Sequence, residues 1–223
     1  VHHPEAGTPQ GGVISPMLSN IVLHYVLDEW FAKEVRPRLK GRSVIIRWAD
    51  DFIIGCELLS DAERIMSVLP KRFNRFKLSL HSEKTKLIRY MKPYSLEQSR
   101  KTGTFDFLGF TFYWGKSLKG YWVVKKRTAR KRLSRFLTGL WQWCKSHRHE
   151  SIQRQHKILC SKLLGFYQYY GVRSNYKALE AAREYARKAW RRWLSRRSSK
   201  GKVTFEDLNK TFPLPLPRIV HQV

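Results

Sequence analysis

The feature that most constrains the fold of this chain is a pair of adjacent carboxylates, Asp50 and Asp51, set between two short apolar runs. The runs 44–48 and 52–56 are rich in β-branched residues and predict two strands joined by a tight Ala-Asp-Asp turn. Two neighbouring negative charges repel each other unless a cation compensates them. Because Mg²⁺ prefers carboxylate oxygens and keeps positions open for phosphates, the pair is a candidate metal site for phosphoryl transfer. The alternative, from the pair alone, is a solvated hairpin turn.

The charge of the chain is strongly positive and unevenly distributed. Its 223 residues include 44 Lys and Arg against 17 Asp and Glu, a net charge of +27. Residues 1–100 contain 16 basic and 11 acidic side chains, whereas residues 101–223 contain 28 and 6. Such an excess opposes a compact chain unless a polyanion neutralises it, and nucleic acid is the obvious candidate. We therefore expect the second half to bind nucleic acid.

The cysteines and the hydropathy favour an intracellular protein. Cys56, Cys144 and Cys160 cannot form a complete disulfide framework, which fits a reducing compartment. A metal site drawn from Cys144, His147, His149 and Cys160 matches no tetrahedral template, and helical packing accounts for these residues. The sequence has no stretch long enough to span a membrane and no signal peptide. The expected location is the cytoplasm, in a bacterial setting and associated with RNA or the nucleoid.

The first half predicts an α+β arrangement. An apolar stripe over 18–30 and another over 62–76 predict two helices, the second opened by a capping box from Ser60 to Glu63. Pro70 is expected to kink or divide that second helix. Short strands are predicted at 78–80 and 87–90, and a hairpin over 105–124 around a turn at 115–120. This order is typical of an antiparallel sheet covered by helices.

The second half predicts a small helical bundle. Three basic helical stretches cover 126–147, 150–170 and 174–198, with Ser174 as the expected N-cap of the third. Trp190 and Trp193 continue an apolar stripe, so we expect them in the core and not as platforms for stacked bases. The Pro-rich tail, 205–223, is expected to lie extended over the surface.

Four sequence blocks in order resemble those of group II intron reverse transcriptases. They are Gly7–Gly12 with Ser15-Pro16, Ala49–Asp51, Glu83–Thr85 and Phe107–Phe110. Within the basic helical part, the stretches 164–171 and 190–193 look like the maturase or thumb region of the same family. Each block alone is weak, but their order and spacing together are specific.

The resemblance implies a fold and an activity. The expected fold class is α+β, with a partial right-hand polymerase palm at 1–124, an all-α basic thumb or maturase region at 125–200 and an extended tail at 201–223. The implied activity is RNA-directed DNA polymerisation, which adds deoxynucleotides to a primer 3′ end by two-metal phosphoryl transfer. Binding of intron RNA would assist splicing and mobility. The implied partners are an RNA template, intron RNA, a DNA or RNA primer and dNTPs, without a membrane and with the oligomeric state open.

The resemblance also assigns roles to particular residues. Asp50 and Asp51 would hold Mg²⁺, or Mn²⁺ in its place, and would be the catalytic carboxylates. Leu108 and Gly109 would form the primer grip. The residues implied to contact template and incoming nucleotide are Gln10, Gly11, Gly12, Trp48, Ala49 and Lys84. Those implied to contact nucleic acid from the thumb are Arg127, Arg130, Arg132 and Arg135.

Two departures from the family pattern qualify these expectations. The family supplies a further metal-binding Asp from a strand before the Gln-Gly-Gly loop, and this sequence does not contain that strand, so we expect the fragment alone to be inactive. Trp48 stands where the family most often has Tyr, so rate or fidelity would differ. The alternative functions are a non-catalytic RNA-binding splicing factor, or a reverse transcriptase of a defence, retron or diversity-generating system. For Lys84 the alternative is a solvated surface lysine.

Overall fold

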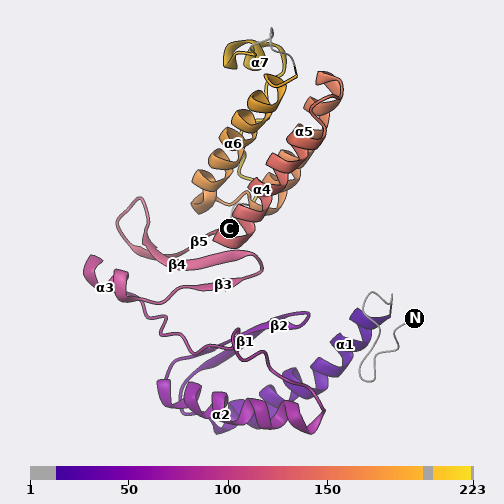
Figure 1. Ribbon diagram of the computed structural model, residues 1–223. Helices are drawn as coiled ribbons and strands as arrows, with labels where there is room; N and C mark the ends of the chain where they lie inside the picture. Colours follow the sequence, from indigo (N-terminus) through magenta and orange to yellow (C-terminus); the bar gives the residue numbers. More distant parts are fainter. Residues whose placement is uncertain (1–13, 198–202, 222–223) are drawn as a thin grey trace. The chain divides into compact units, whose positions relative to one another are not determined.

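The computed structural model describes residues 14–197 and 203–221, and the chain divides into two compact units, Val1–Ile88 and Arg89–Val223. Across the described residues there are seven α-helices and two small antiparallel sheets (Figure 1). The predicted α+β class with a helical C-terminal part is therefore confirmed. The boundary between the compact units differs from the functional boundary predicted at 124/125, which stays a prediction. None of the helices in the described part of the chain has the length and apolarity needed to span a bilayer.

The first unit packs a β-hairpin on one long helix. Its elements are α1 (Ser15–Leu23), the π-helical turns η1 (His24–Glu29) and η2 (Phe31–Val35), the 3₁₀ turn η3 (Arg36–Arg38), β1 (Ser43–Trp48), β2 (Asp51–Cys56) and α2 (Leu59–Arg75). Apolar residues spaced four apart on α2, Ile65, Leu69 and Phe73, are buried against η1 and η2. Phe52 and Ile54 of β2 pack on the same cluster. The hairpin is thus fixed by its inner face.

The start of α2 is capped differently from the prediction. The helix begins at Leu59, and no side chain caps its N-terminus. Asp61, only 1% exposed, instead accepts hydrogen bonds from the backbone N–H groups of Lys40 (3.0 Å) and Gly41 (2.8 Å). Asp61, which lies inside the predicted box, therefore ties the loop before β1 to α2. Pro70 lies inside α2 without dividing it.

The prediction of two short strands after α2, at 78–80 and 87–90, is wrong. Residues 76–95 are all described, and none of them is in a strand. Leu78 and Leu80 are apolar because they pack against the core of the first unit, and no neighbouring strand pairs with them. The alternation of apolar residues at 78–80 therefore reflects the packing of an irregular segment on the core.

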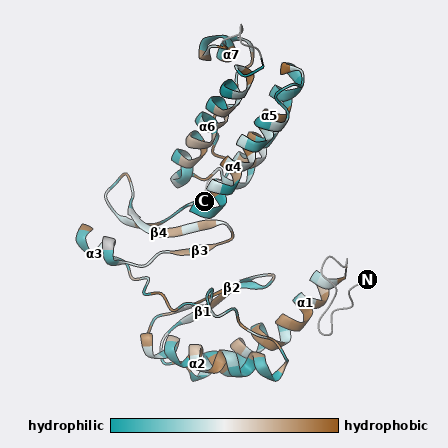
Figure 2. Cartoon of the chain, in the orientation of Figure 1, coloured by the Kyte–Doolittle hydropathy of each residue, from teal (hydrophilic) through white to brown (hydrophobic). Residues whose placement is uncertain are grey.

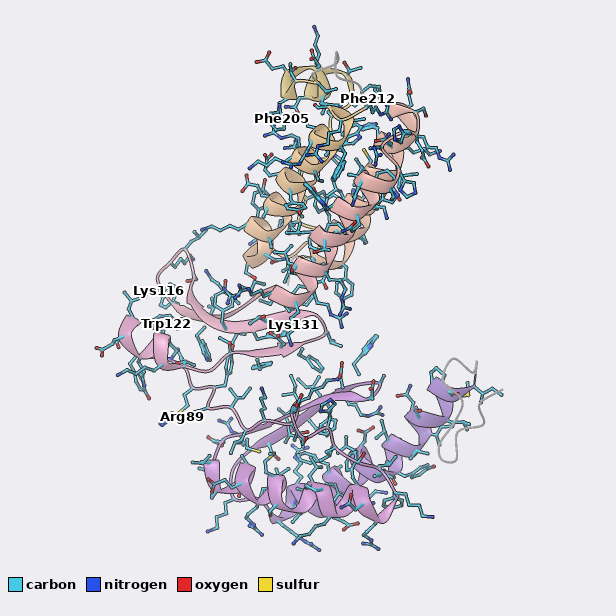
Figure 3. The ribbon with its side chains drawn as sticks, in the orientation of Figure 1. Arg89, Lys116, Trp122, Lys131, Phe205 and Phe212 are labelled. Atoms are coloured by element: carbon cyan, nitrogen blue, oxygen red, sulfur yellow. The ribbon has the colours of Figure 1, made fainter. Side chains whose placement is uncertain are left out.

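The second unit opens with the short helix α3 (Leu96–Lys101) and a three-stranded meander. The strands are β3 (Phe105–Phe107), β4 (Phe110–Lys116) and β5 (Trp122–Thr128), in the order β3-β4-β5. The single hairpin predicted over 105–124 is therefore incomplete. The chain reverses a first time at Leu108 and Gly109, whose φ values of 49° and 77° allow a two-residue turn. At the other hairpin, the Lys116 ammonium lies 5.6 Å from the Trp122 ring (Figure 3).

The bundle of the second unit consists of α4 (Arg130–Ser146), α5 (Ile152–Tyr170) and α6 (Tyr176–Leu194), with the 3₁₀ turn η4 (Arg173–Asn175) before α6. These are the three predicted helices. Trp190 (1% exposed) and Trp193 (8%) belong to the core, as expected. The segment predicted to be wholly extended begins with a helix, α7 (Phe205–Thr211), and continues as an extended segment. The guanidinium of Arg191 lies over the Phe205 ring, 4.2 Å from the ring centroid, in a cation–π contact (Figure 3 labels Phe205).

A buried amide joins the sheet to the bundle. Asn175, 1% exposed, accepts a hydrogen bond from the Thr128 N–H (2.8 Å) and donates to the Thr128 hydroxyl (2.8 Å) and the Tyr170 carbonyl (2.9 Å). Ser174, predicted as an N-cap, instead bonds both backbone groups of Lys126. The residues before α6 therefore stitch β5 to the end of α5.

We predict that Asn175→Ala destabilises the second unit by about 2–3 kcal/mol, because it leaves the buried Thr128 N–H without a partner and removes two further hydrogen bonds. Urea unfolding of the complete protein, followed by tryptophan fluorescence, measures the change. Asn209→Ala, at an exposed position of α7, is the matched control and should leave the midpoint nearly unchanged. Equal behaviour of the two variants would contradict the stitching role of Asn175.

Candidate active site

The two adjacent carboxylates lie where the β1–β2 hairpin reverses. Trp48 pairs with Asp51 across the hairpin, so Ala49 and Asp50 are the two turn residues and Asp51 already belongs to β2. Ala49 has a φ of 53°, a left-handed conformation that costs a non-glycine residue about 1–2 kcal/mol. Such a conformation persists only where its surroundings hold it.

The Arg47 guanidinium holds this turn. Its Nε and Nη2 donate to the Asp28 carboxylate, with contacts of 2.6–3.0 Å. Its Nη1 donates to the Asn20 side-chain oxygen (2.8 Å) and to the Ala49 carbonyl (2.8 Å). Because α1 contributes Asn20 and η1 contributes Asp28, one side chain fixes the turn to the first helix. Hydrogen bonding to Asp28 raises the pKa of Arg47, so the clamp is charged at every working pH.

The carboxylates of Asp50 and Asp51 are exposed, and neither forms a hydrogen bond or an ion pair with another described residue. Arg47, which donates to the carbonyl of the turn residue Ala49, forms its ion pair with Asp28. Adjacent, unpaired oxygen ligands on a fixed turn suit a hard cation such as Mg²⁺. Within residues 14–197 and 203–221, however, no three His, Cys, Asp or Glu side chains gather into a complete metal site. Asp50 and Asp51 can therefore supply part of the ligand set of a Mg²⁺ ion.

The outer face of β1 places apolar groups beside the carboxylates. Val44 and Ile46 are each 55% exposed, and Trp48 is 68% exposed. Exposed apolar residues also lie on α1, where Figure 2 shows brown segments. An indole that stands in solvent next to two free carboxylates is available to pack against a nucleobase or sugar.

The other predicted contacts of template and nucleotide are placed only in part. Lys84 is exposed in the turn at 82–84, and its side chain has no ion-pair partner among the described residues. Gln10, Gly11 and Gly12 lie outside the described residues. The predicted grip residues, Leu108 and Gly109, form the β3–β4 turn of the second unit, as described above.

The four predicted thumb arginines do not lie on one surface: three are on α4 and one is on β5. Arg130 and Arg135 line a shallow, open groove of about 790 Å³ along α4, together with Lys131, which the sequence reasoning missed (Figure 3 labels Lys131). Arg132 is exposed on α4 but does not line this groove. Arg127 lies on β5, its guanidinium 5.2 Å from the Tyr113 ring.

The basic groove of α4 carries uncompensated charge. The helix has five basic residues and no acidic one, and no described carboxylate forms an ion pair with any of them. The ion pairs of the second unit use other cations, such as Arg154 and Arg187. A solvent-exposed row of free cations attracts a polyanion.

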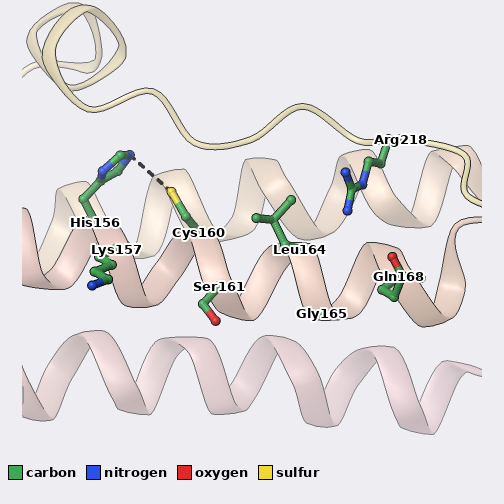
Figure 4. Close-up of a pocket in the computed structure, with 8 residues that line it drawn as sticks. All are labelled: His156, Lys157, Cys160, Ser161, Leu164, Gly165, Gln168 and Arg218. Carbon is green, nitrogen blue, oxygen red and sulfur yellow. Dashed lines mark hydrogen bonds between the residues drawn. The ribbon is translucent and has the colours of Figure 1, made fainter.

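A second groove, of about 690 Å³, lies between α5 and the extended C-terminal segment (Figure 4). Here His156 Nε2 lies 3.3 Å from Cys160 Sγ and 3.0 Å from the Pro213 carbonyl oxygen. Burial raises the pKa of the Cys160 thiol, which disfavours the thiolate needed for metal binding. Cys144 is fully buried in the bundle core, and burial raises its pKa to about 12. Packing accounts for both cysteines.

The residues that fix the candidate site were not found by sequence reasoning. Asp28 and Asn20 lie on helical turns that carry no motif of their own. A signal for Arg47 did exist, because it follows Ile45 on the inward face of an otherwise apolar strand. A charge on that face needs a partner, and the sequence offers Asp28 on the preceding helix.

We predict that Arg47→Met destabilises the first unit by about 2–3 kcal/mol, since the partly buried Asp28 carboxylate loses its charged donor. Arg42→Met is the matched control: it removes an arginine next to the same strand, whose ion pair with Glu57 is largely exposed. In urea unfolding, Arg47→Met should lower the midpoint, whereas Arg42→Met should leave the midpoint almost unchanged. Equal midpoints would contradict the clamp.

Comparison with known proteins places these features in one family. Residues 1–112, just over half of the chain, match the family model described as reverse transcriptase (RNA-dependent DNA polymerase). The match includes the β1–β2 turn and the β3–β4 turn, whereas the helices of the bundle follow it. A search of curated proteins found no match. The chain belongs to the reverse transcriptase family, whose members are RNA-dependent DNA polymerases and hence nucleotidyltransferases.

Proposed function

We propose that Asp50 and Asp51 are the metal-holding carboxylates of an RNA-directed DNA polymerase of the group II intron type. The observation that carries this proposal is that both carboxylates are unpaired on a turn fixed by Arg47. The family generally uses Mg²⁺. The four sequence blocks support the intron type, and a further carboxylate from elsewhere would complete the ligand set.

The residues of this chain have separate tasks in the proposed reaction. A primer 3′ oxygen attacks the α-phosphorus of the incoming deoxynucleotide, and pyrophosphate leaves. Bound Mg²⁺ would supply charge neutralisation at the attacking and leaving oxygens. Arg47 keeps the Ala49–Asp50 turn in place, so the two carboxylates need no rearrangement. The exposed Trp48 indole packs against the primer end, and the Leu108–Gly109 turn contacts the primer backbone.

The basic face of α4 is proposed to hold nucleic acid. A-form duplexes are gripped mainly through their phosphates and their shape, which suits a row of exposed cations on a helix. Arg130, Lys131 and Arg135 line the α4 groove and have no carboxylate partner among the described residues. In the intron-type proposal, this face binds the template–primer duplex and intron RNA, and through the latter it assists splicing and mobility.

We predict that Asp50→Asn in the complete protein lowers primer extension on an RNA template at least about a thousandfold, because a metal ligand at the reacting phosphate is lost. RNA binding should change less than about twofold. Glu63→Gln, which neutralises an exposed carboxylate of α2 in the same unit, is the matched control and should leave both properties unchanged.

The contradicting result is primer extension by Asp50→Asn at the normal rate. Normal splicing of a group II intron by the same variant would support a separate RNA-binding role. If neither wild-type protein nor variant affects splicing while wild-type protein extends primers, the intron assignment fails and a reverse transcriptase of a defence, retron or diversity-generating system remains.

We predict that the double variant Arg130→Gln, Arg135→Gln weakens RNA binding and lowers the slope of log K against log salt by roughly 2, since about two phosphate contacts are lost. Affinity measured at several salt concentrations gives the slope. Lys177→Gln with Lys188→Gln removes the same charge from exposed positions of α6 and is the control. An equal slope change in both double variants would show that net charge matters and the α4 face does not.

A further inference from the structure

The β3–β4 turn leaves an unusual set of backbone groups exposed. Leu108 and Gly109 both have positive φ, which a two-residue type I′ hairpin requires. Glycine adopts this conformation readily, but leucine is strained in it. The backbone N–H groups of both residues have no hydrogen-bond partner in the described part of the chain. Two consecutive free N–H groups in a turn are suited to an anion such as a phosphodiester.

Both carbonyls of the turn are held by the protein. The Tyr169 hydroxyl donates to the Leu108 carbonyl at 2.9 Å, and the Ala129 N–H donates to the Gly109 carbonyl at 2.9 Å. With both acceptors engaged, the N–H donors are the polar groups of the turn left for a ligand. Ala129 also precedes α4, the helix with the basic face.

Two consecutive tyrosines at the end of α5 fix the turn from one side. The Tyr169 ring stacks on Phe110 with centroids 5.8 Å apart and 16° between the planes. The Tyr170 ring meets Phe110 edge-on at 5.1 Å. The Tyr170 hydroxyl lies 2.8 Å from the point that a Cβ on Gly109 would occupy, so only glycine fits there without movement.

The end of α5 is itself immobilised by the stitch described above. Asn175 bonds both the Tyr170 carbonyl and Thr128 of β5. The strained turn, the end of α5 and the start of α4 are therefore joined by short hydrogen bonds into one body. A turn built in this way keeps a fixed distance from the cations of α4.

We propose that Tyr169 and Tyr170 are positioning residues for the polymerase: they hold the Leu108–Gly109 turn so that it grips the primer phosphates in register with the α4 basic face. This inference rests on the proposed function, in which the turn contacts primer and α4 contacts the duplex. Neither tyrosine touches the reacting atoms. Their effect is on where the primer lies.

The first test is Tyr169→Phe in the complete protein, probed with a recessed RNA–DNA hybrid that has a DNA primer strand. The variant removes the hydroxyl and keeps the ring that stacks on Phe110. We expect Kd and KM for the hybrid to rise roughly three- to tenfold, as loss of one hydrogen bond allows. We expect kcat to stay within about twofold and the melting temperature to stay unchanged. Tyr176→Phe is the matched control, because Tyr176 is partly exposed and its hydroxyl has no hydrogen bond among the described residues.

The second test is a double-variant cycle on Gly109 and Tyr170. Gly109→Ala should raise Kd more than Tyr169→Phe does, because its Cβ meets the Tyr170 hydroxyl and its φ is strained. Tyr170→Phe alone should bind normally. Combined with Gly109→Ala, it removes the colliding oxygen and should recover at least about threefold in Kd.

Three results would overturn the inference. The first is Tyr169→Phe with wild-type Kd and KM, and the second is no recovery in the Gly109–Tyr170 double variant. The third is a Tyr169→Phe defect that follows a lowered melting temperature and reduces kcat as much as it raises KM, which is the signature of a merely structural role. Because Kd does not depend on chemistry, these outcomes stand apart from the Asp50→Asn test. Normal extension by Asp50→Asn would refute the proposed function, and a normal Tyr169→Phe would refute only this inference.

Discussion

The candidate site depends on one guanidinium group. Arg47 is the point at which α1, η1 and the β1–β2 turn meet through hydrogen bonds. It donates to the carbonyl of Ala49, which has a left-handed conformation, and it forms an ion pair with Asp28. Asp50 and Asp51 are consequently left as the unpaired charges of the hairpin. The charge needed to fix the turn is thus separated from the charges available to a metal.

The β3–β4 turn is held in the same way as the β1–β2 turn. Ala49 and Leu108 are both non-glycine turn residues with positive φ, and in each case a side chain from a helix or strand donates to the carbonyl of the strained residue. Arg47 does this in the first unit and Tyr169 in the second. Strain at functional turns persists where neighbouring groups determine the backbone. Both turns lie in the part of the chain that matches the reverse transcriptase family.

The sequence predicted what depends on local patterns. The hairpin around Asp50, the long helix α2 and the three helices of the bundle follow from periodicity, and Trp190 was expected in the core. Features set by distant partners were missed. Asp61 looked like part of a capping box but bonds a loop some 20 residues away, Ser174 looked like an N-cap but bonds Lys126, and the Asp28–Arg47 pair carries no motif. The turn at Leu108 and Gly109 was missed because β3 and β4, the strands on either side of it, have similar apolar compositions and looked like one strand.

We propose above that the Asp50–Asp51 turn holds the metal of a polymerase centre. The most direct measurement replaces Mg²⁺ with Fe²⁺ in the complete protein bound to a primer–template, and maps where metal-generated hydroxyl radicals cut the polypeptide. Cleavage within residues 46–52 that excess Mg²⁺ suppresses, and that Asp50→Asn abolishes, is the predicted result. Cleavage elsewhere with this segment intact would contradict the claim.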